Sequence, residues 1–255
     1  MTTPATVVFF HAHPDDEAIF TGGTIRRLAD DGHRVVVVLA THGATDPASP
    51  AAAVRVEEAR AACAVLGAAR LATLGFGDSG LRADDAPGHS FWAADTHEVA
   101  EHLAALLREE QAAALVVYDD HGIYGHPDHV AVHRVGMAAA ALADTPTVYE
   151  CTVDREYLHF VETHLVGHAV ESLLGAPIRS TNTAPLGMPT VLISVTVDVR
   201  AQHAAKRAAM AAHASQIPAD SEALRMDADT FEGVYGYEWY TRVVGPPGPL
   251  EPLGF

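Results

Sequence analysis

Two short clusters of histidine and aspartate carry the chemistry that this sequence can perform. Residues 13–17 read HPDDE, and residues 126–129 read HPDH. Adjacent carboxylates repel one another unless a positive charge lies between them, and a divalent metal ion supplies such a charge. His13, Asp16 and His129 together would offer two imidazoles and one carboxylate, with one coordination position left open. That composition is typical of a catalytic zinc site rather than a closed structural one.

Asp15 and His126 are the candidates for moving protons at such a site. Adjacent residues point apart, so Asp15 can face a water molecule at the open position, whose pKa a zinc ion lowers to about 7. Asp15 could then accept the proton of that water as a general base. His126 is the candidate general acid for a leaving amine, or a group that stabilises a tetrahedral oxyanion. We expect the carboxylate of Asp128 to hold the His126 ring and to raise its pKa.

Each of these residues also has a purely structural explanation. Asp16 could cap the helix that follows it, because aspartate is a good N-cap residue. His129 could be a buried core histidine, and Asp15 or Asp128 could simply begin a helix. Tyr124 could donate a hydrogen bond to an oxyanion, or it could pack as a loop aromatic. Metal binding is favoured because the sequence contains two clusters that can converge.

The clusters can converge because each one follows a predicted strand and precedes a predicted helix. Residues 6–10 form an apolar run before the first cluster, and residues 113–118 form another before the second. Parallel strands place ligand sites at their carboxyl ends, along one edge of the sheet. The predicted strands are 6–10, 34–40, 70–74, 113–118, 146–152 and 191–197, and the predicted helices are 18–31, 51–66, 94–109, 128–141, 156–174 and 200–214. This alternation predicts an α/β class, Rossmann-like, with a mostly parallel sheet and helices on both faces.

Length and composition favour one domain that spans residues 1–255. The chain has 255 residues, 49% of them hydrophobic, which is enough to bury a full core, and no linker divides it. Gly67 follows the helix 51–66 at the position where a left-handed glycine commonly ends a helix. Residues 175–189 are irregular in pattern. The proline- and glycine-rich composition of segment 243–255 predicts a mobile or surface-hugging tail.

Composition also bounds the location and the partners. No run of about eighteen apolar residues occurs, so we expect no membrane span. The amino terminus lacks the pattern of a signal peptide, which favours the cytoplasm. The net charge of −17 and the lack of a basic stripe argue against a nucleic-acid partner. Cys63 and Cys151 have no metal-type spacing and are expected to be small buried hydrophobes. The oligomeric state stays open, a homo-oligomer included.

The two clusters resemble those of the LmbE-like, or PIG-L, family of zinc-dependent N-acetylglucosamine deacetylases, which includes the deacetylases of mycothiol and bacillithiol biosynthesis. Three further segments are similar in the same order. Residues 55–67 resemble the arginine-containing second helix that ends in Leu-Gly, 78–80 the Asp-Ser-Gly substrate loop, and 212–216 the carboxyl-terminal His-x-Ser-Gln segment. The resemblance covers residues 6–153 well and is patchy beyond them.

The resemblance implies a hydrolase that removes the acetyl group from an N-acetylglucosamine-type small-molecule substrate, with Zn²⁺ as cofactor and Asp15 as general base. It also implies that Arg55 and Asp78 contact the sugar, since a guanidinium and a carboxylate suit oriented hydrogen bonds to hydroxyl groups. For His11 and His213 two alternatives stay open: each could support the residues of the site, or have no role in it.

Two alternatives remain beside this function. One is a zinc hydrolase of another N-acyl sugar or glycan conjugate. For either hydrolase, the sequence does not distinguish zinc from iron or cobalt as the metal used in the cell. The other is a metal-loaded sugar-binding protein without turnover, although binding alone needs neither Asp15 nor His126. The group attached to the sugar is not defined by the sequence, and the segments 75–90 and 154–189 are the expected places for its recognition.

Overall fold

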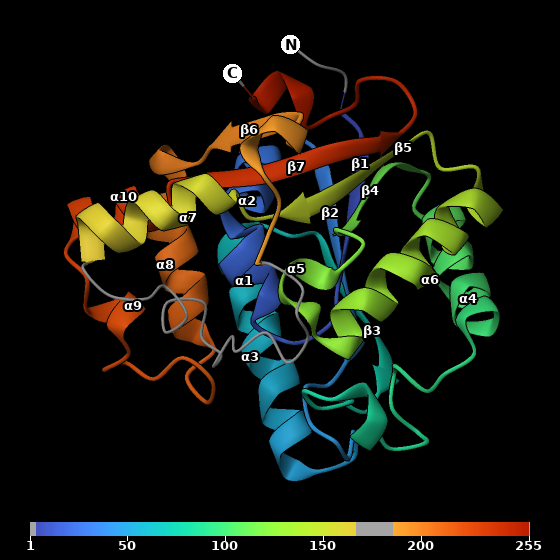
Figure 1. Cartoon of the computed structure of the whole chain (residues 1–255). Helices are drawn as coiled ribbons and strands as arrows, with labels where there is room; N and C mark the ends of the chain where they lie inside the picture. Colours follow the sequence, from blue (N-terminus) through green and yellow to red (C-terminus); the bar gives the residue numbers. More distant parts are fainter. Residues whose placement is uncertain (1–3, 167–185, 255) are drawn as a thin grey trace.

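A seven-stranded sheet forms the centre of the computed structural model, which describes residues 4–166 and 186–254 (Figure 1). The strand order is β3-β2-β1-β4-β5-β7-β6. The first five strands along the chain pair in parallel, and β7 pairs antiparallel with both β5 and β6. The strands are β1 (Thr6–His11), β2 (Arg34–Thr41), β3 (Arg70–Phe76), β4 (Ala112–Tyr118), β5 (Thr147–Thr152), β6 (Val195–Asp198) and β7 (Tyr237–Val244).

Helices cover both faces of this sheet, which is why its central strands are apolar throughout. On one face α4 packs against α6, and on the other α2, α3 and α8 pack together (Figure 1). The helices are α1 (Asp16–Phe20), α2 (Gly22–Asp30), α3 (Pro50–Leu66), α4 (Thr96–Glu109), α5 (Gly122–Gly125), α6 (Pro127–Ala143), α7 (Arg155–Val161), α8 (His203–Ala212), α9 (Glu222–Arg225) and α10 (Ala228–Tyr235). The predicted α/β class and Rossmann-like, mostly parallel sheet are confirmed.

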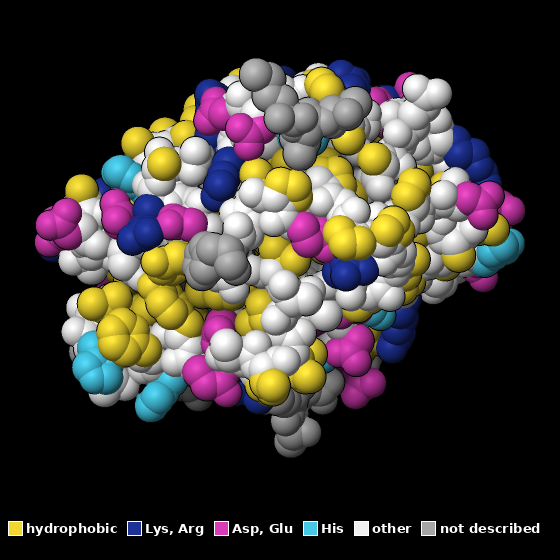
Figure 2. All heavy atoms as spheres, turned by 90° about the horizontal axis from the view of Figure 1, so that it is seen from above, with side chains coloured by type: hydrophobic (Ala, Val, Ile, Leu, Met, Phe, Trp, Pro, Cys, Tyr) yellow, Lys and Arg dark blue, Asp and Glu magenta, His cyan; other side chains and the backbone are white. Residues whose placement is uncertain are grey.

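The core is centred on strands β1, β2 and β4. Val7, Val8, Phe9 and Phe10 of β1 are fully buried, since both sides of the strand face helices. Cys63 and Cys151 are buried as expected, and Gly67 ends α3 with a left-handed φ of 77°. Across the described residues, no helix has the length and apolar character that crossing a bilayer requires. On the face seen in Figure 2, lysine and arginine side chains are scattered rather than gathered into one basic patch.

The helix predicted over residues 18–31 is in fact two helices, α1 and α2, with Thr21 between them. The Thr21 hydroxyl donates to the carbonyl of Glu17, and the chain then restarts at Gly22. The carboxylate of Glu238, from distant β7, accepts hydrogen bonds from the amides of Gly23 and Thr24, both at 2.8 Å. A tertiary contact therefore caps the second helix, and the local pattern contains no signal for it.

The last quarter of the chain differs most from the prediction. The strand expected over 191–197 is shorter, because residues 190–192 form a 3-10 turn before β6. Helices α9 and α10 and strand β7 were not predicted. In β7, Glu238 lies between apolar neighbours, is buried and pairs with Lys206. Because charged residues are usually exposed, its presence hides the pattern of a core strand.

Two further predictions concern the segments around residue 160 and the carboxyl terminus. Helix α7 and a following turn occupy 155–166, whereas residues 167–185, predicted as the rest of a helix and an irregular stretch, lie outside the described residues. The segment predicted as a mobile or surface-hugging tail, 243–255, begins within β7. Residues 243 and 244 complete β7, and Leu250 and Leu253 are buried, so these apolar side chains anchor the segment on the body of the protein.

Candidate active site and metal centre

The two sequence clusters meet because β1 and β4 are neighbours in the sheet. Their register pairs Phe9 with Val116, so both strands end at the same edge. His13 and Asp16 follow β1, and His129 lies in the first turn of α6, just beyond β4. All three side chains are buried, with His129 fully so. Residues more than a hundred positions apart thus form one cluster.

The three predicted metal ligands converge on one carboxylate oxygen. Asp16 Oδ2 lies 3.3 Å from His13 Nδ1 and 3.4 Å from His129 Nε2. One ligand atom from each residue lies within 4.8 Å of the other two. Burial opposes the charge on Asp16, but His129 and His13 outweigh it and hold its pKa well below the ordinary value. This buried set of two nitrogens and one carboxylate fits a divalent cation with an open coordination position.

Asp128 supports His13 rather than His126, so the predicted pairing of Asp128 with the His126 ring is wrong. Asp128 Oδ2 lies 3.1 Å from His13 Nε2 and accepts the backbone amide of Ser79 at 2.9 Å. The Ser79 hydroxyl donates to the other oxygen. With its Nε2 proton directed at Asp128, His13 presents Nδ1 to the metal position. Such carboxylate–imidazole pairs orient metal ligands and fix their tautomer.

A second histidine–aspartate group shares His13 and lies beside the first. It consists of His13, Asp78, His126 and Asp128. Both oxygens of Asp128 are engaged by Ser79, and Asp78 Oδ1 accepts the amide of Gly80. Asp16 Oδ2 of the first group also accepts an amide, from His13 at 2.8 Å, but in the second group both oxygens of Asp128 and the Nδ1 of His126 hold protein donors. We therefore take the second group as a hydrogen-bonded frame and the first as the metal site.

His126 caps the helix that carries His129. Its Nδ1 accepts the backbone amide of Asp128 at 3.1 Å, and Pro127 occupies the first helical position, which favours this geometry. Nδ1 therefore carries no proton, and the neutral ring presents an Nε2–H donor. Burial, together with His13 and His129 nearby, lowers the pKa of His126 to about 3. The predicted raised pKa of His126 is wrong, because helix capping and burial favour the uncharged ring.

Asp15 is held in an unusual backbone conformation. Its φ of 122° and ψ of −31° lie where side-chain-bearing residues are strained. Its amide donates to Glu17 Oε2 at 3.1 Å. Burial and the neighbouring Asp16 raise the pKa of Asp15 to about 7, although Arg55 opposes the shift. A carboxyl group that titrates near neutrality is suited to general base chemistry.

Glu17 connects this strained residue to the carboxyl-terminal half of the chain. Its Oε1 lies 2.6 Å from His213 Nε2, and both side chains are fully buried. Burial opposes the charge on His213, but the attraction of Glu17 outweighs it, so the pKa of His213 is raised. Each residue belongs to a recognised motif, yet 196 positions separate them and nothing in the sequence pairs them.

Arg55 and Asp78 were expected to contact the substrate, and the structure gives both of them protein partners. Arg55 Nη2 donates to the carbonyl of Pro14 at 2.8 Å and lies 3.5 Å from Asp15 Oδ2, while Nη1 donates to Gly43. Asp78 Oδ2 lies 3.5 Å from His13 Nε2. Arg55 thus braces the loop of Asp15, and Asp78 lies at the rim of the site, partly exposed.

Two tyrosines contact the metal-ligand candidate His129. Tyr124 Oη lies 3.3 Å from His129 Nε2, so this predicted residue does face the site. Tyr118, which the sequence did not single out, stacks on the His129 ring at 4.2 Å between centroids and 14° between planes. His11 Nδ1 lies 2.9 Å from Tyr118 Oη. His129 Nδ1 has no hydrogen-bond partner among the described residues, so stacking on Tyr118 and the Nε2 contacts with Tyr124 and Asp16 together orient this ring.

Gly122 explains how the loop before α6 can lie so close to His129. Its φ is 67°, and a Cβ placed there would be 2.6 Å from the Cβ of His129. The next residue, Ile123, also has a positive φ of 64°, which strains a β-branched side chain. Only glycine at position 122 permits this approach, so the turn that delivers Tyr124 and His126 depends on it.

Comparisons with known proteins agree with this geometry. The sequence profile of the family described as "PIG-L: GlcNAc-PI de-N-acetylase" matches residues 8–140. A 1D-myo-inositol 2-acetamido-2-deoxy-alpha-D-glucopyranoside deacetylase from Salinispora arenicola is 36% identical, over 95% of this chain and 86% of that protein. A protein of the same name from Thermobispora bispora is 34% identical, over 95% and 89% of the two chains.

Solved structures with this fold are more distant in sequence. An N,N'-diacetylchitobiose deacetylase from Pyrococcus horikoshii aligns with a TM-score of 0.60 and 23% identity, covering 94% of this chain and 84% of that one. A deacetylase of teicoplanin biosynthesis aligns with a TM-score of 0.63 and 18% identity, covering 94% and 98%. A 4-carboxy-2-hydroxymuconate hydratase from Pseudomonas putida also aligns, with a TM-score of 0.59 and 16% identity, covering 95% and 98%. The fold alone therefore does not define the reaction.

The reaction is instead defined by the family profile and by the sequence identity to the deacetylases. The predicted membership and the predicted deacetylase activity are confirmed by both. The chain belongs to the PIG-L family, and it is a hydrolase that removes an N-acetyl group from a sugar derivative.

Proposed function

We propose that the substrate is a glycoside of N-acetylglucosamine and that zinc is the metal. The observation that carries the proposal is the buried set His13, Asp16 and His129, one ligand atom of each within 4.8 Å of the others, beside Asp15, whose backbone is held in a strained conformation. The relatives named above act on an N-acetylglucosamine linked to inositol, and that compound is the first candidate for this chain. A cytoplasmic location stays a prediction from the sequence.

The donor set supports zinc among the divalent metals. Two imidazoles and one carboxylate are characteristic ligands of catalytic zinc, and the Asp128–His13 pair supplies the usual second partner of a ligating imidazole. A divalent cation bound by His13, Asp16 and His129 would supply Lewis-acid chemistry, polarising the amide carbonyl and acidifying water.

Asp15 is the residue that moves protons. Its carboxylate accepts a proton from the water that attacks the acetamide carbonyl carbon. As the C–N bond breaks, the same carboxyl group can return the proton to the amine nitrogen, since its pKa of about 7 suits both directions near neutrality. The products are acetate and the free amine. Arg55 and Glu17 keep Asp15 in place through the contacts described above.

His126 and Tyr124 stabilise negative charge on the carbonyl oxygen. The neutral His126 ring, capped at Nδ1 by the Asp128 amide, offers its Nε2–H as a hydrogen-bond donor. Tyr124 offers its hydroxyl, and burial raises its pKa so that it keeps its proton. Preorganised donors of this kind typically contribute about 10²–10³ in kcat each. Asp78, which is partly exposed, would accept a sugar hydroxyl.

The test is release of free amine and acetate from N-acetylglucosaminyl inositol. Protein stripped of metal should be inactive, and addition of one equivalent of Zn²⁺ should restore turnover. Iron and cobalt, added separately, rank the metals. Tight binding of the sugar without amine release would instead favour the sugar-binding protein, and release only from other N-acyl sugars would favour the alternative hydrolase.

A further inference from the structure

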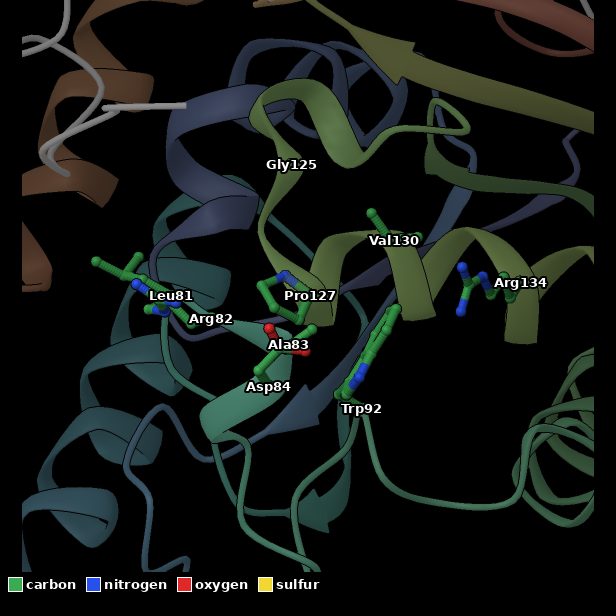
Figure 3. Close-up of a pocket in the computed structure, with 9 residues that line it drawn as sticks. All are labelled: Leu81, Arg82, Ala83, Asp84, Trp92, Gly125, Pro127, Val130 and Arg134. Carbon is green, nitrogen blue, oxygen red and sulfur yellow. The ribbon is translucent and has the colours of Figure 1, made fainter. Parts of the chain in front are cut away.

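A pocket of about 330 Å³ lies beside the catalytic cluster and takes no part in the chemistry described so far (Figure 3). We call it the lateral pocket. Its walls come from the loop after Asp78, from the start of α6 and from the segment before α4. The residues that matter for its chemistry are Arg82, Asp84, Trp92, Gly125, Pro127 and Arg134.

The lateral pocket borders the chain segments that carry active-site residues. Gly125 and Pro127 line it, and they flank His126 in the sequence. Trp92, on another wall, donates its backbone amide to the Ser79 hydroxyl at 3.0 Å, and Ser79 in turn holds Asp128. A group bound in the pocket would therefore lie next to a sugar whose acetamide is at His126.

The pocket combines an aromatic ring with one uncommitted charge of each sign. The guanidinium of Arg134 lies 4.7 Å from the centre of the Trp92 ring. Among the residues that the structure describes, Arg134 pairs with no carboxylate and Asp84 with no cation. Arg82, by contrast, is already paired with Asp85 at 3.2 Å. Figure 3 shows Trp92 and Arg134 on one side and Asp84 on the other.

Such a lining selects for a neutral ring with several hydroxyl groups. Each hydroxyl can both donate to Asp84 and accept from Arg134, while the Trp92 ring packs against C–H faces. An aliphatic chain would remove both charges from water without replacing their hydrogen bonds. An anion would be attracted by Arg134 and repelled by Asp84, while Arg82 on the same wall is already neutralised by Asp85. The volume is at the lower end for ligand sites, so it suits a single ring rather than a lipid.

We propose that the lateral pocket binds the hydroxylated ring joined to N-acetylglucosamine, a cyclitol or a second sugar, and so determines which conjugate is deacetylated. This inference rests on the proposed function. The pocket adds selectivity between conjugates and leaves the chemistry at Asp15 unchanged.

Amine release from four probes tests the proposal: N-acetylglucosaminyl inositol, N-acetylglucosamine 1-phosphate, and the methyl and octyl glycosides of N-acetylglucosamine. Wild type should prefer the inositol conjugate over the methyl glycoside. Arg134→Gln and Asp84→Asn should each lower kcat/KM on the conjugate by about 10-fold, the scale of one hydrogen bond to a charged group, and by less than about 2-fold on the methyl glycoside. Arg60→Gln is the matched control and should change neither, because Arg60 is an exposed arginine of α3 that pairs with Glu57 and does not line the pocket.

The outcomes separate this proposal from the proposed function. If no probe releases amine, the proposed function fails. Suppose that wild type deacetylates the conjugate. If the variants then lose activity equally on the conjugate and the methyl glycoside, or lose no activity on either, the lateral pocket does not bind the ring. A preference for the phosphate or the octyl glycoside that Arg134→Gln abolishes would overturn the neutral ring as its occupant.

Discussion

Glu17 is a carboxylate that two donors need at once, and replacing it by glutamine should slow catalysis without removing metal. Oε2 accepts the amide of Asp15 at 3.1 Å, and Oε1 faces His213 Nε2 at 2.6 Å. A glutamine side chain has one oxygen, so it can satisfy only one of these two donors. Its amide group would then point an N–H at the other donor. Glu17→Gln therefore unpins either Asp15 or His213 while keeping the size of the side chain.

The expected loss follows from the strain at Asp15. A residue held in a sparsely populated backbone region costs roughly 1–3 kcal/mol, and the surrounding contacts must supply that energy. If the contact with Glu17 is lost, the strained conformer becomes rarer by up to this amount. Since about 1.4 kcal/mol is tenfold, kcat should fall roughly 5- to 150-fold. KM should change little, because Asp15 acts on the water rather than on the sugar.

The assay is amine release together with metal analysis of the same preparations. Glu17→Gln should keep about one metal ion per chain, because His13, Asp16 and His129 are intact. Glu58→Gln is the matched control: it removes a carboxylate that binds the amide and hydroxyl of Ser215 near His213 but does not touch Asp15. Glu58→Gln should keep kcat within about 2-fold. A folded, metal-replete Glu17→Gln protein with wild-type kcat would refute the reasoning.

Four further predictions follow from the site. His129→Ala should lower metal content and activity together, and full metal occupancy in that variant would refute its role as a ligand. Asp15→Asn should keep the metal and lose roughly 10²-fold or more in kcat, as expected for a general base, and unchanged kcat would exclude it. His126→Gln keeps an N–H donor and should retain at least about 10-fold more kcat than His126→Ala, whereas equal losses would contradict the donor role. Because the pKa of His213 is raised, metal-free wild type should have a higher free energy of unfolding than His213→Gln, with the full difference below about pH 6.5 and a smaller one as the pH rises through the folded-state pKa. Denaturant titrations at several pH values measure this difference, and a difference that grows with pH would contradict the prediction.

The convergence of the two clusters could be predicted because its causes are local. Apolar runs before residues 13 and 126 define β1 and β4, and Pro127 marks the start of α6. The rule that parallel strands place sites at one edge then brings His13, Asp16 and His129 together. This step needs only strand order, which the alternation of strands and helices constrains strongly.

The partners of the ligands could not be predicted, because they depend on distant loops. Asp128 points to His13 since the loop around Ser79 packs over it and fills both of its oxygens. The sequence suggested His126 for Asp128 only because the two residues are near neighbours. Glu17 and His213 were weighed one at a time for the same reason: each has an ordinary local explanation until the fold places them 2.6 Å apart.

The same limitation explains the missed strand β7. Its central residue, Glu238, is charged, and a charge normally indicates an exposed position. Here the carboxylate is buried because Lys206 pairs with it and because two amides at the start of α2 donate to it. The buried Glu238 carboxylate thus makes the tertiary contact that caps α2 and separates it from α1. The two wrong predictions, one long helix over 18–31 and no strand at β7, therefore have the same cause.

Carboxylates from distant segments therefore define the geometry of this site. They also couple metal binding to the release of a proton from His13. Burial opposes the charge on His13, but Asp78 and Asp128 outweigh it and hold its pKa well above the ordinary value in the metal-free chain. A metal ligand must present an unprotonated nitrogen, so a cation has to displace a proton from His13 when it binds. The protonated ring partly balances the surrounding carboxylates until the metal replaces that charge. The buried acids that orient His13 thereby make metal affinity fall as the pH is lowered, in a site whose ligands are otherwise already in place.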